Sequence, residues 1–169
     1  MAKFNISNYK RRATRKKKVL SAFMRKLGKS TQKGLQKIAL ETDKEVWKEV
    51  ACLDCGNCCK QMTPTFSNKD IKRISAHFEM TPKEFHKKWL KKDSSKDIVN
   101  KQTPCQFLGK DLKCSIYAIR PQDCADFPHF TRSNFKYQVQ EKTYINNIGY
   151  CPATLLFVEK LEAKLADVI

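Results

Sequence analysis

The sequence predicts a mainly α-helical fold with irregular loops and at most a small β-hairpin. Apolar residues recur at helical spacing in five separate segments, and clear helix-start signals mark three of them. Only one short segment alternates apolar and polar residues as a half-buried strand would. Because 169 residues suit one ordinary domain, we expect a single small domain with a basic N-terminal helical arm.

The arm is expected to comprise residues 1–42, because the basic residues are concentrated there. Residues 1–40 contain thirteen Lys and Arg and no Asp or Glu, whereas the rest of the chain contains twenty-one Lys and Arg and all seventeen acids. Apolar residues follow helical spacing over 19–27 and again over 35–50, and Gly28 and Ser30 lie between these stretches. The arm is therefore predicted to be partly helical, or else disordered.

Two readings of the arm remain open. Its basic residues could bind the phosphates of nucleic acid or an anionic membrane face through contacts that weaken with salt. Alternatively, residues 1–40 are a solvated, partly disordered tail. The N-terminus lacks the apolar core of a secretory signal, and no apolar run is long enough for a transmembrane segment. We expect a cytoplasmic protein, and the sequence does not indicate a protein partner.

In the body, residues 43–169, two helix-start signals follow the first cysteine cluster. In "SNKDIKRISAHF", Ser67 stands three residues before Asp70, which is a capping-box pattern. In "TPKEFHKKWL", Thr81 is the expected N-cap, and Pro82 and Glu84 follow at the positions that a helix start favours. Each stretch therefore predicts a short helix.

The remaining segments of the body are expected in this order. The polar stretch 91–104 reads as a loop, and 104–117, "PCQFLGKDLKCSIY", as a small knuckle or hairpin. The best strand candidate is 135–140, "FKYQVQ", and the following segment 141–150 gives no firm signal. Pro152 opens a closing helix with apolar residues at helical spacing up to Leu165.

Cysteine is the residue type with the most informative spacing. The motif "CLDCGNCC" places three cysteines at C-x2-C-x2-C spacing, which can turn several sulfurs toward one metal. In a chain without a secretion signal, such density indicates metal binding or catalysis rather than disulfides. The alternative is packing thiols in the core. The candidate ligands are Cys52, Cys55, Cys58, Cys59, Cys105, Cys114, Cys124 and Cys151.

The spacing excludes the common small metal folds. A zinc ribbon needs a second C-x2-C, a bacterial ferredoxin needs a different fourth cysteine, and a classical zinc finger needs a paired His motif. An all-cysteine ligand set favours zinc or iron. Eight thiolates could fill two tetrahedral zinc sites, or four could hold one 4Fe-4S cluster. Adjacent Cys58 and Cys59 are expected to point in different directions, which implies two centres or one ligand beside a packed or reactive thiol.

Four blocks in order, "CLDCGNCC", "TFSNKDIKRI", "PCQFLGKDLKCSIYAIRPQDCADFPH" and "YCPA", resemble the zinc- or iron-chelating domain of YkgJ-like cysteine-cluster proteins, which is named for its CxxCxxCC motif. The resemblance covers roughly residues 50–155 and implies that the seven cysteines from Cys52 to Cys124 bind metal, with Cys151 as an eighth. It also relates the chain to the cysteine domain of flagellin lysine N-methylases, which are thought to use an iron–sulfur cluster.

Several other residues near the cysteines in the sequence are candidates for the site. His129 could be a ligand or could support one, and Asp123 and Asp126 could accept hydrogen bonds from ligands or act as acids. The alternative is that the histidine has a structural role and that the two aspartates are solvated loop residues. Tyr117 and Arg120 match the family motif, and an arginine beside thiolates could offset their charge.

Three functions follow from this reading. The first is a cysteine-rich protein that chelates zinc or iron, with a redox, metal-handling or structural role. The second is an iron–sulfur-dependent modifying enzyme of the lysine N-methylase kind, although the sequence shows neither a nucleotide-binding glycine loop nor a C-x3-C-x2-C motif. The third is a nucleic-acid-binding module with structural zinc. The bound metal would hold the irregular loops together and would supply much of the folding free energy.

Overall fold

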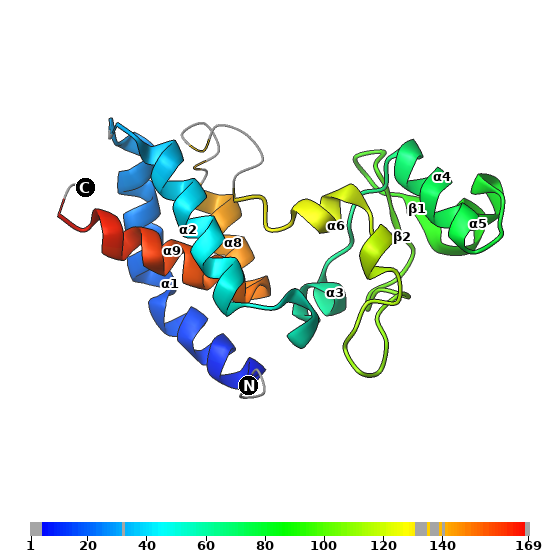
Figure 1. Ribbon diagram of the computed structural model, residues 1–169, viewed down its shortest axis with the longest axis horizontal. Coiled ribbons are helices and arrows are strands. Elements are labelled where there is room, and N and C mark those ends of the chain that lie inside the picture. Colours follow the sequence, from blue (N-terminus) through cyan, green and yellow to red (C-terminus); the bar gives the residue numbers. More distant parts are fainter. Residues whose placement is uncertain (1–4, 32, 131–134, 136–138, 140, 168–169) are drawn as a thin grey trace. The chain divides into compact units, whose positions relative to one another are not determined.

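The computed structural model describes residues 5–31, 33–130, 135, 139 and 141–167, and its chain forms two compact units (Figure 1). Unit 1 combines the two chain ends, Met1–Cys52 and Pro128–Ile169, and unit 2 is Leu53–Phe127. The division into domains at residue 42 stays a prediction, and the compact units have other bounds. The described chain is mainly helical with one two-stranded antiparallel hairpin, so the predicted fold class is confirmed.

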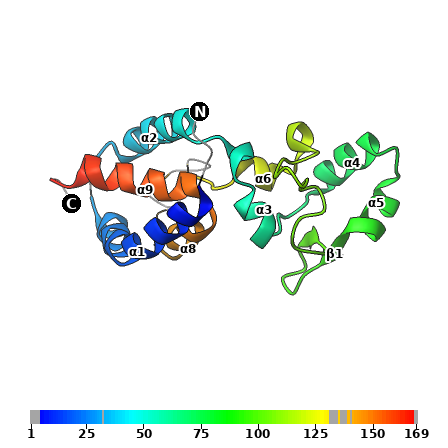
Figure 2. The ribbon, with the colours of Figure 1, turned by 90° about the horizontal axis from the view of Figure 1, so that it is seen from below.

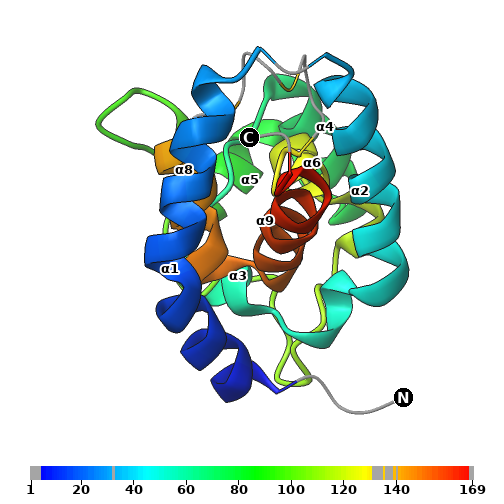
Figure 3. The same ribbon diagram turned by 90° about the vertical axis from the view of Figure 1, so that its left-hand side faces the viewer.

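Unit 1 is a bundle of helices in which α9 has the central place. Its long helices are α1 (Ile6–Lys29), α2 (Leu35–Glu49), α8 (Glu141–Tyr150) and α9 (Pro152–Leu165). Helix α9 contacts the other three, and Figures 2 and 3 both show it between α1 and α2. The predicted closing helix is confirmed, and the basic N-terminal segment is folded rather than a loose tail.

Apolar residues of α1 enter the core of unit 1. Leu20 and Met24 are fully buried there, and the ring of Phe157 stacks on Phe130 with 4.1 Å between the centroids. Val19, which the periodicity placed on the apolar face, is instead 59% exposed, so that assignment was wrong. Leu20 and Met24 are four residues apart and so share the buried face of α1. Val19 lies outside that face.

A buried carboxylate ties α9 to the basic helix α1. The Glu159 side chain is 8% exposed and forms ion pairs with Arg12 at 2.5 Å and with Lys16 at 2.9 Å. A buried charge is costly unless it is paired and hydrogen-bonded. Two of the basic residues of α1 therefore have a structural role within unit 1.

Unit 2 is built from short elements around a compact aromatic core. Its helices are α3 (Asn57–Gln61), α4 (Asn68–His77), α5 (Pro82–Trp89) and α6 (Gln122–Asp126), with a short turn of 3-10 helix at Tyr117–Ile119. Both predicted capping boxes are present, with Ser67 and Thr81 as N-caps. The core residues are Phe66, Ile71, Ile74, Phe85, Leu90, Phe107 and Ile116.

The hairpin of unit 2 lies where the sequence predicted a loop. Strands β1 (Leu90–Lys92) and β2 (Ile98–Asn100) pair antiparallel, with Leu90 opposite Asn100. The segment is polar and has no strand periodicity, but Leu90 and Val99 are buried by tertiary packing. Packing overrides the weak local preference here.

The strand candidate 135–140 lies largely outside the described residues. Phe135 is described and is helical rather than extended, and it is fully buried in unit 1. None of the described helices has both the length and the hydropathy that crossing a membrane requires.

Candidate metal centre

The cysteines fall on both units, and six of them belong to unit 2. Cys58 and Cys59 lie on α3, Cys55 precedes that helix, and Cys124 lies on α6. Cys105 and Cys114 flank the turn that follows β2. Cys52 is the last residue of the first segment of unit 1, and Cys151 is the N-cap of α9 in the same unit. No disulfide links any of the eight, all of which lie in described parts of the chain.

A glycine lets the motif helix approach the turn that carries the next cysteines. Gly56 has a positive φ of 55°, which favours glycine, and it directly precedes α3. A Cβ atom at this position would lie 3.1 Å from both the Leu108 side chain and the Leu112 carbonyl oxygen. A larger residue here would therefore strain the backbone and press on the 105–114 turn.

Backbone hydrogen bonds fix this approach. The Cys105 N–H donates to the carbonyl oxygen of Cys59 at 2.8 Å. An isolated antiparallel bridge joins Leu108 to Cys114, and the Gly109 N–H donates to the Lys113 carbonyl oxygen at 2.8 Å. The predicted knuckle at 104–117 is thus present as a single bridge and turn. It brings Cys105 and Cys114 to the motif helix.

Cys59 is the electrostatic centre of the thiols in unit 2. A hydrogen bond with Cys58 lowers the pKa of Cys59 to about 7, against the partial burial that would raise it. The pKa values of Cys55, Cys105, Cys114 and Cys124 are raised, first by burial and also by the charge on Cys59. The five thiols are therefore close enough for a charge on one to raise the pKa of another. A second thiolate beside Cys59 would need a nearby cation to offset this repulsion.

Backbone amides already face three of these sulfurs. The N–H groups of Asn57, Phe107 and Ile116 donate to the thiols of the cysteines two positions earlier, and each bond lowers that pKa. A neutral thiol is a weak acceptor, whereas a thiolate is a strong, charged one. Each amide therefore offsets part of the rise that burial causes in the pKa of its cysteine, and it would stabilise the thiolate form that binds metal.

The thiols are neighbours but do not form a closed coordination sphere. Within the described ranges, no three Cys, His, Asp or Glu side chains are placed so that together they could hold one ion. The Sγ atoms of Cys58 and Cys59 are 4.0 Å apart, so the expectation that these neighbours point in different directions was wrong. Two sulfurs on one tetrahedral zinc would be about 3.8 Å apart, from a Zn–S bond of about 2.3 Å. The thiolate donor type fits zinc or iron, although the described side chains do not enclose an ion.

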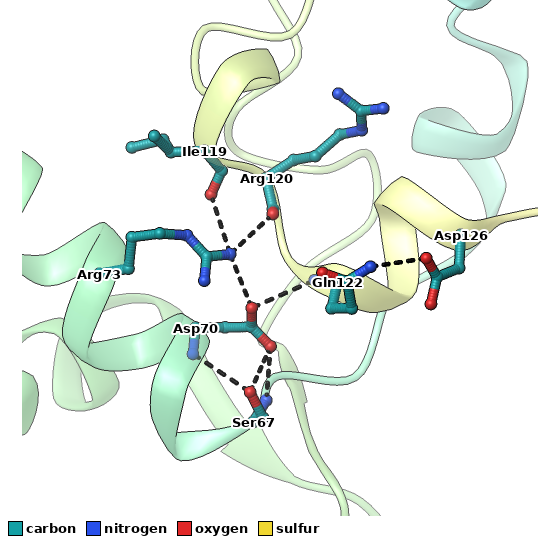
Figure 4. Close-up of polar contacts among 7 residues, drawn as sticks. All are labelled: Ser67, Asp70, Arg73, Ile119, Arg120, Gln122 and Asp126. Carbon is teal, nitrogen blue, oxygen red and sulfur yellow. Dashed lines mark hydrogen bonds and ion pairs between the residues drawn. The ribbon is translucent and has the colours of Figure 1, made fainter.

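Asp70 connects α4 to the segment that carries Cys124 (Figure 4). Its carboxylate is buried and accepts hydrogen bonds from the Ser67 backbone at 3.0 Å, the Arg73 guanidinium at 2.7 Å and the Gln122 backbone at 3.1 Å. Arg73 also donates to the carbonyl oxygen of Arg120 at 3.0 Å. Burial alone would raise the pKa of Asp70, but these bonds lower it.

We expect Asp70→Asn to destabilise unit 2 by about 1–3 kcal/mol at pH 7, because the variant leaves buried donors without a charged acceptor. The folded-state pKa lies below the unfolded value of about 3.9. The stabilisation is therefore present above about pH 4 and is lost as the pH falls through the folded-state pKa.

Urea unfolding of the wild type and the variant at pH 7 and pH 3 measures this difference. Asp126→Asn is the control, because the hydrogen bond that Asp126 accepts from Gln122 is exposed, and we expect an effect within about 0.5 kcal/mol. A penalty for Asp70→Asn that is the same at both pH values would contradict the assignment.

The other candidate residues have mainly structural contacts. Asp123 accepts a hydrogen bond from the Thr65 backbone at 3.0 Å, and Asp126 accepts one from Gln122 at 2.6 Å. The Arg120 guanidinium lies 3.9 Å from the Tyr117 ring centre, and its charge lowers the pKa of Cys114. Arg120 would therefore offset part of the charge of a thiolate at Cys114. His129 belongs to unit 1.

Sequence reasoning missed two residues of the site. The Asn100 side-chain amide donates to the Cys105 Sγ at 3.5 Å, and Gln106 donates to the Asn100 Oδ1 at 2.9 Å. Both residues lie in or beside segments read as loop and knuckle, where an amide carries no local signal. Only the pairing of β2 with β1 places Asn100 beside the sulfur.

Comparison with known proteins supplies the class of the site. A model of the CxxCxxCC family, described as "Putative zinc- or iron-chelating domain", matches residues 51–152. This match covers more than half of the chain and all eight cysteines. No solved structure matches the chain. The chain belongs to the CxxCxxCC family of zinc- or iron-chelating domains.

Proposed function

We propose that unit 2 holds zinc or iron through a cluster of cysteine thiolates and that this metal organises its fold. The observation that carries the proposal is the gathering of Cys55, Cys59, Cys105, Cys114 and Cys124 from separated segments into one electrostatic neighbourhood. Cys58 lies beside Cys59, whereas Cys52 and Cys151 belong to unit 1 and lie within the residues that the family model matches.

The chemistry of the site favours a soft, tightly held metal. Thiolates select zinc, iron and iron–sulfur clusters over magnesium, calcium or manganese. When bound, the metal would neutralise several thiolates that now raise one another's pKa values. The backbone N–H groups that donate to three of the sulfurs, and the charge of Arg120, would also stabilise the thiolates. A reducing compartment such as the cytoplasm would keep the thiols available.

Alkylation of the thiols tests this proposal and maps the ligands. Metal-free, reduced protein is treated with iodoacetamide with and without Zn²⁺, and each cysteine is quantified by mass spectrometry. We expect Zn²⁺ to slow alkylation at least tenfold at the five clustered cysteines. Cys52, Cys58 and Cys151 are assigned as ligands if they are protected at the same metal concentration. Unchanged alkylation of the five would overturn the proposal.

An iron–sulfur enzyme of the lysine N-methylase kind is the alternative within the same site. It requires inorganic sulfide as well as iron, and a cosubstrate that supplies a methyl group. Acid-labile sulfide in protein purified without oxygen would favour this alternative, and zinc without sulfide would count against it.

A second candidate function, nucleic-acid binding, is favoured by one feature of α1. Arg11, Arg15, Lys18, Arg25 and Lys29 follow spacings of three, four or seven residues and are all exposed, so they form one basic stripe along the helix. The apolar face of α1 is used by the core of unit 1 and is not available for insertion into a bilayer. Phosphates of nucleic acid fit this stripe better than a membrane does.

We expect Arg11→Gln, Arg15→Gln and Lys18→Gln together to weaken binding of a 20-base-pair duplex at least tenfold and to reduce the salt dependence, because each lost phosphate contact lowers the slope by about one. The matched control removes the same charge from exposed positions of unit 2, with Lys69→Gln, Lys72→Gln and Lys83→Gln. Fluorescence anisotropy at several salt concentrations measures both variants. Equal losses in the two variants, or no binding by the wild type, would refute a specific role for the stripe.

A further inference from the structure

A buried amide pair lies beside the thiol cluster in unit 2. Asn100 is fully buried at the end of β2, opposite Leu90 of β1. Its Nδ2 lies 3.5 Å from the Cys105 Sγ, within the distance for a hydrogen bond to sulfur. The Gln106 Nε2 donates to the Asn100 Oδ1 at 2.9 Å.

The hydrogen bonds determine which way the Asn100 amide faces. Gln106 donates to the oxygen of Asn100, and the NH2 group of Asn100 faces the sulfur. The Oε1 of Gln106 is buried and has no hydrogen-bond partner among the described residues. Gln106 therefore gives up one hydrogen bond in an arrangement that orients Asn100.

The arrangement suits a thiolate better than a thiol. A buried amide donor directed at a neutral thiol gains little, because that sulfur is a weak acceptor. A metal-bound thiolate carries charge and accepts strongly. The Phe107 N–H donates to the same sulfur, so Cys105 receives hydrogen bonds from two directions. Groups that donate to ligands set their orientation and their electron donation to the metal.

We propose that Asn100 is a positioning residue of the metal centre, which orients the Cys105 sulfur and withdraws electron density from it, and that Gln106 orients Asn100. This inference rests on the proposed thiolate metal site and adds residues that the cysteine motif does not contain. It predicts that the amide changes the electronic properties of the bound metal as well as the stability of unit 2.

Co²⁺ is the probe, because its sulfur-to-metal charge-transfer band reports on the thiolates directly. We expect Asn100→Leu, which has a similar volume and no donor, to shift this band of the full chain to longer wavelength. It should also weaken Co²⁺ binding about 10–100-fold, the usual range for loss of a group that supports a ligand. Gln106→Met should shift the band the same way by a smaller amount, because the amide of Asn100 remains but is no longer oriented.

Ser75→Ala is the matched control. Ser75 is also buried in unit 2, and its hydroxyl donates to the Lys72 carbonyl oxygen rather than to a sulfur. We expect its cobalt spectrum and affinity to equal those of the wild type. A spectrum and affinity of folded Asn100→Leu that match the wild type would overturn the inference. If that variant does not fold, a wild-type spectrum for Gln106→Met overturns it instead. The absence of a thiolate band in the wild type would reject the metal site itself.

Discussion

Cys59→Ser is expected to lower zinc affinity at least a hundredfold. The pKa of Cys59 is lowered to about 7, so this thiol is readily available as a thiolate at neutral pH. Its charge acts on four other cysteines, and its backbone carbonyl holds Cys105 in place. Serine keeps the shape of the side chain and the backbone contact but supplies a smaller, hard oxygen in place of a soft sulfur.

Cys151→Ser is the comparison for this effect. Cys151 is partly buried and packs against the core of unit 1, so the substitution removes a thiol without changing the clustered cysteines. We expect less than a tenfold loss, measured by competition with a chromogenic chelator under reducing conditions. Wild-type zinc affinity in Cys59→Ser would contradict the central place given to Cys59. An equal loss in Cys151→Ser would show that the eighth cysteine is as important as the cluster.

Removal of the metal is expected to unfold unit 2 and to leave unit 1 folded. The described core of unit 2 is small, and small folds usually need a metal or disulfides to supplement the hydrophobic core. Its elements are short helices and a hairpin whose two strands have three residues each. Unit 1 has long helices around a larger described core. A bound structural metal contributes folding free energy directly, on the order of 10 kcal/mol for zinc peptides.

Hydrogen exchange followed by mass spectrometry separates the two units in one sample. After treatment with a strong chelator, amides of α4 and α5 should lose at least a hundredfold protection, about 2.7 kcal/mol, while those of α1 and α9 keep theirs. Readdition of Zn²⁺ should restore the protection and exclude damage by the chelator. Full protection of α4 and α5 without metal would show that unit 2 folds through its apolar core alone.

Local signals predicted the parts of the fold that depend on nearby residues. The capping boxes at Ser67 and Thr81 and the proline at position 152 identified three helix starts, because each signal is complete within one turn. The β1–β2 hairpin was missed, because Leu90 and Val99 are buried only by tertiary contacts. The grouping of both chain ends in unit 1 also depends on long-range packing, which charge and periodicity do not reveal.

The cysteines of the candidate site were evident from the sequence, and the residues that surround them were not. Cysteine spacing is a direct signal, because thiols two residues apart can meet at one metal. The orientation of Cys58 relative to Cys59 depends on the helical turn of α3, and the expectation that they diverge was therefore wrong. Asn100 and Gln106 reach Cys105 only through the hairpin, and their amides look like ordinary loop residues in the sequence.

The most direct test of the metal centre is the composition of the protein purified without oxygen. Metal and acid-labile sulfide are measured on one sample, together with the number of reduced thiols as a control for oxidation. We predict at least one zinc or iron per chain that survives gel filtration and is lost in Cys59→Ser. Protein with reduced thiols that contains neither metal, and that does not take up Zn²⁺ or Fe²⁺ when these are added, would contradict the account.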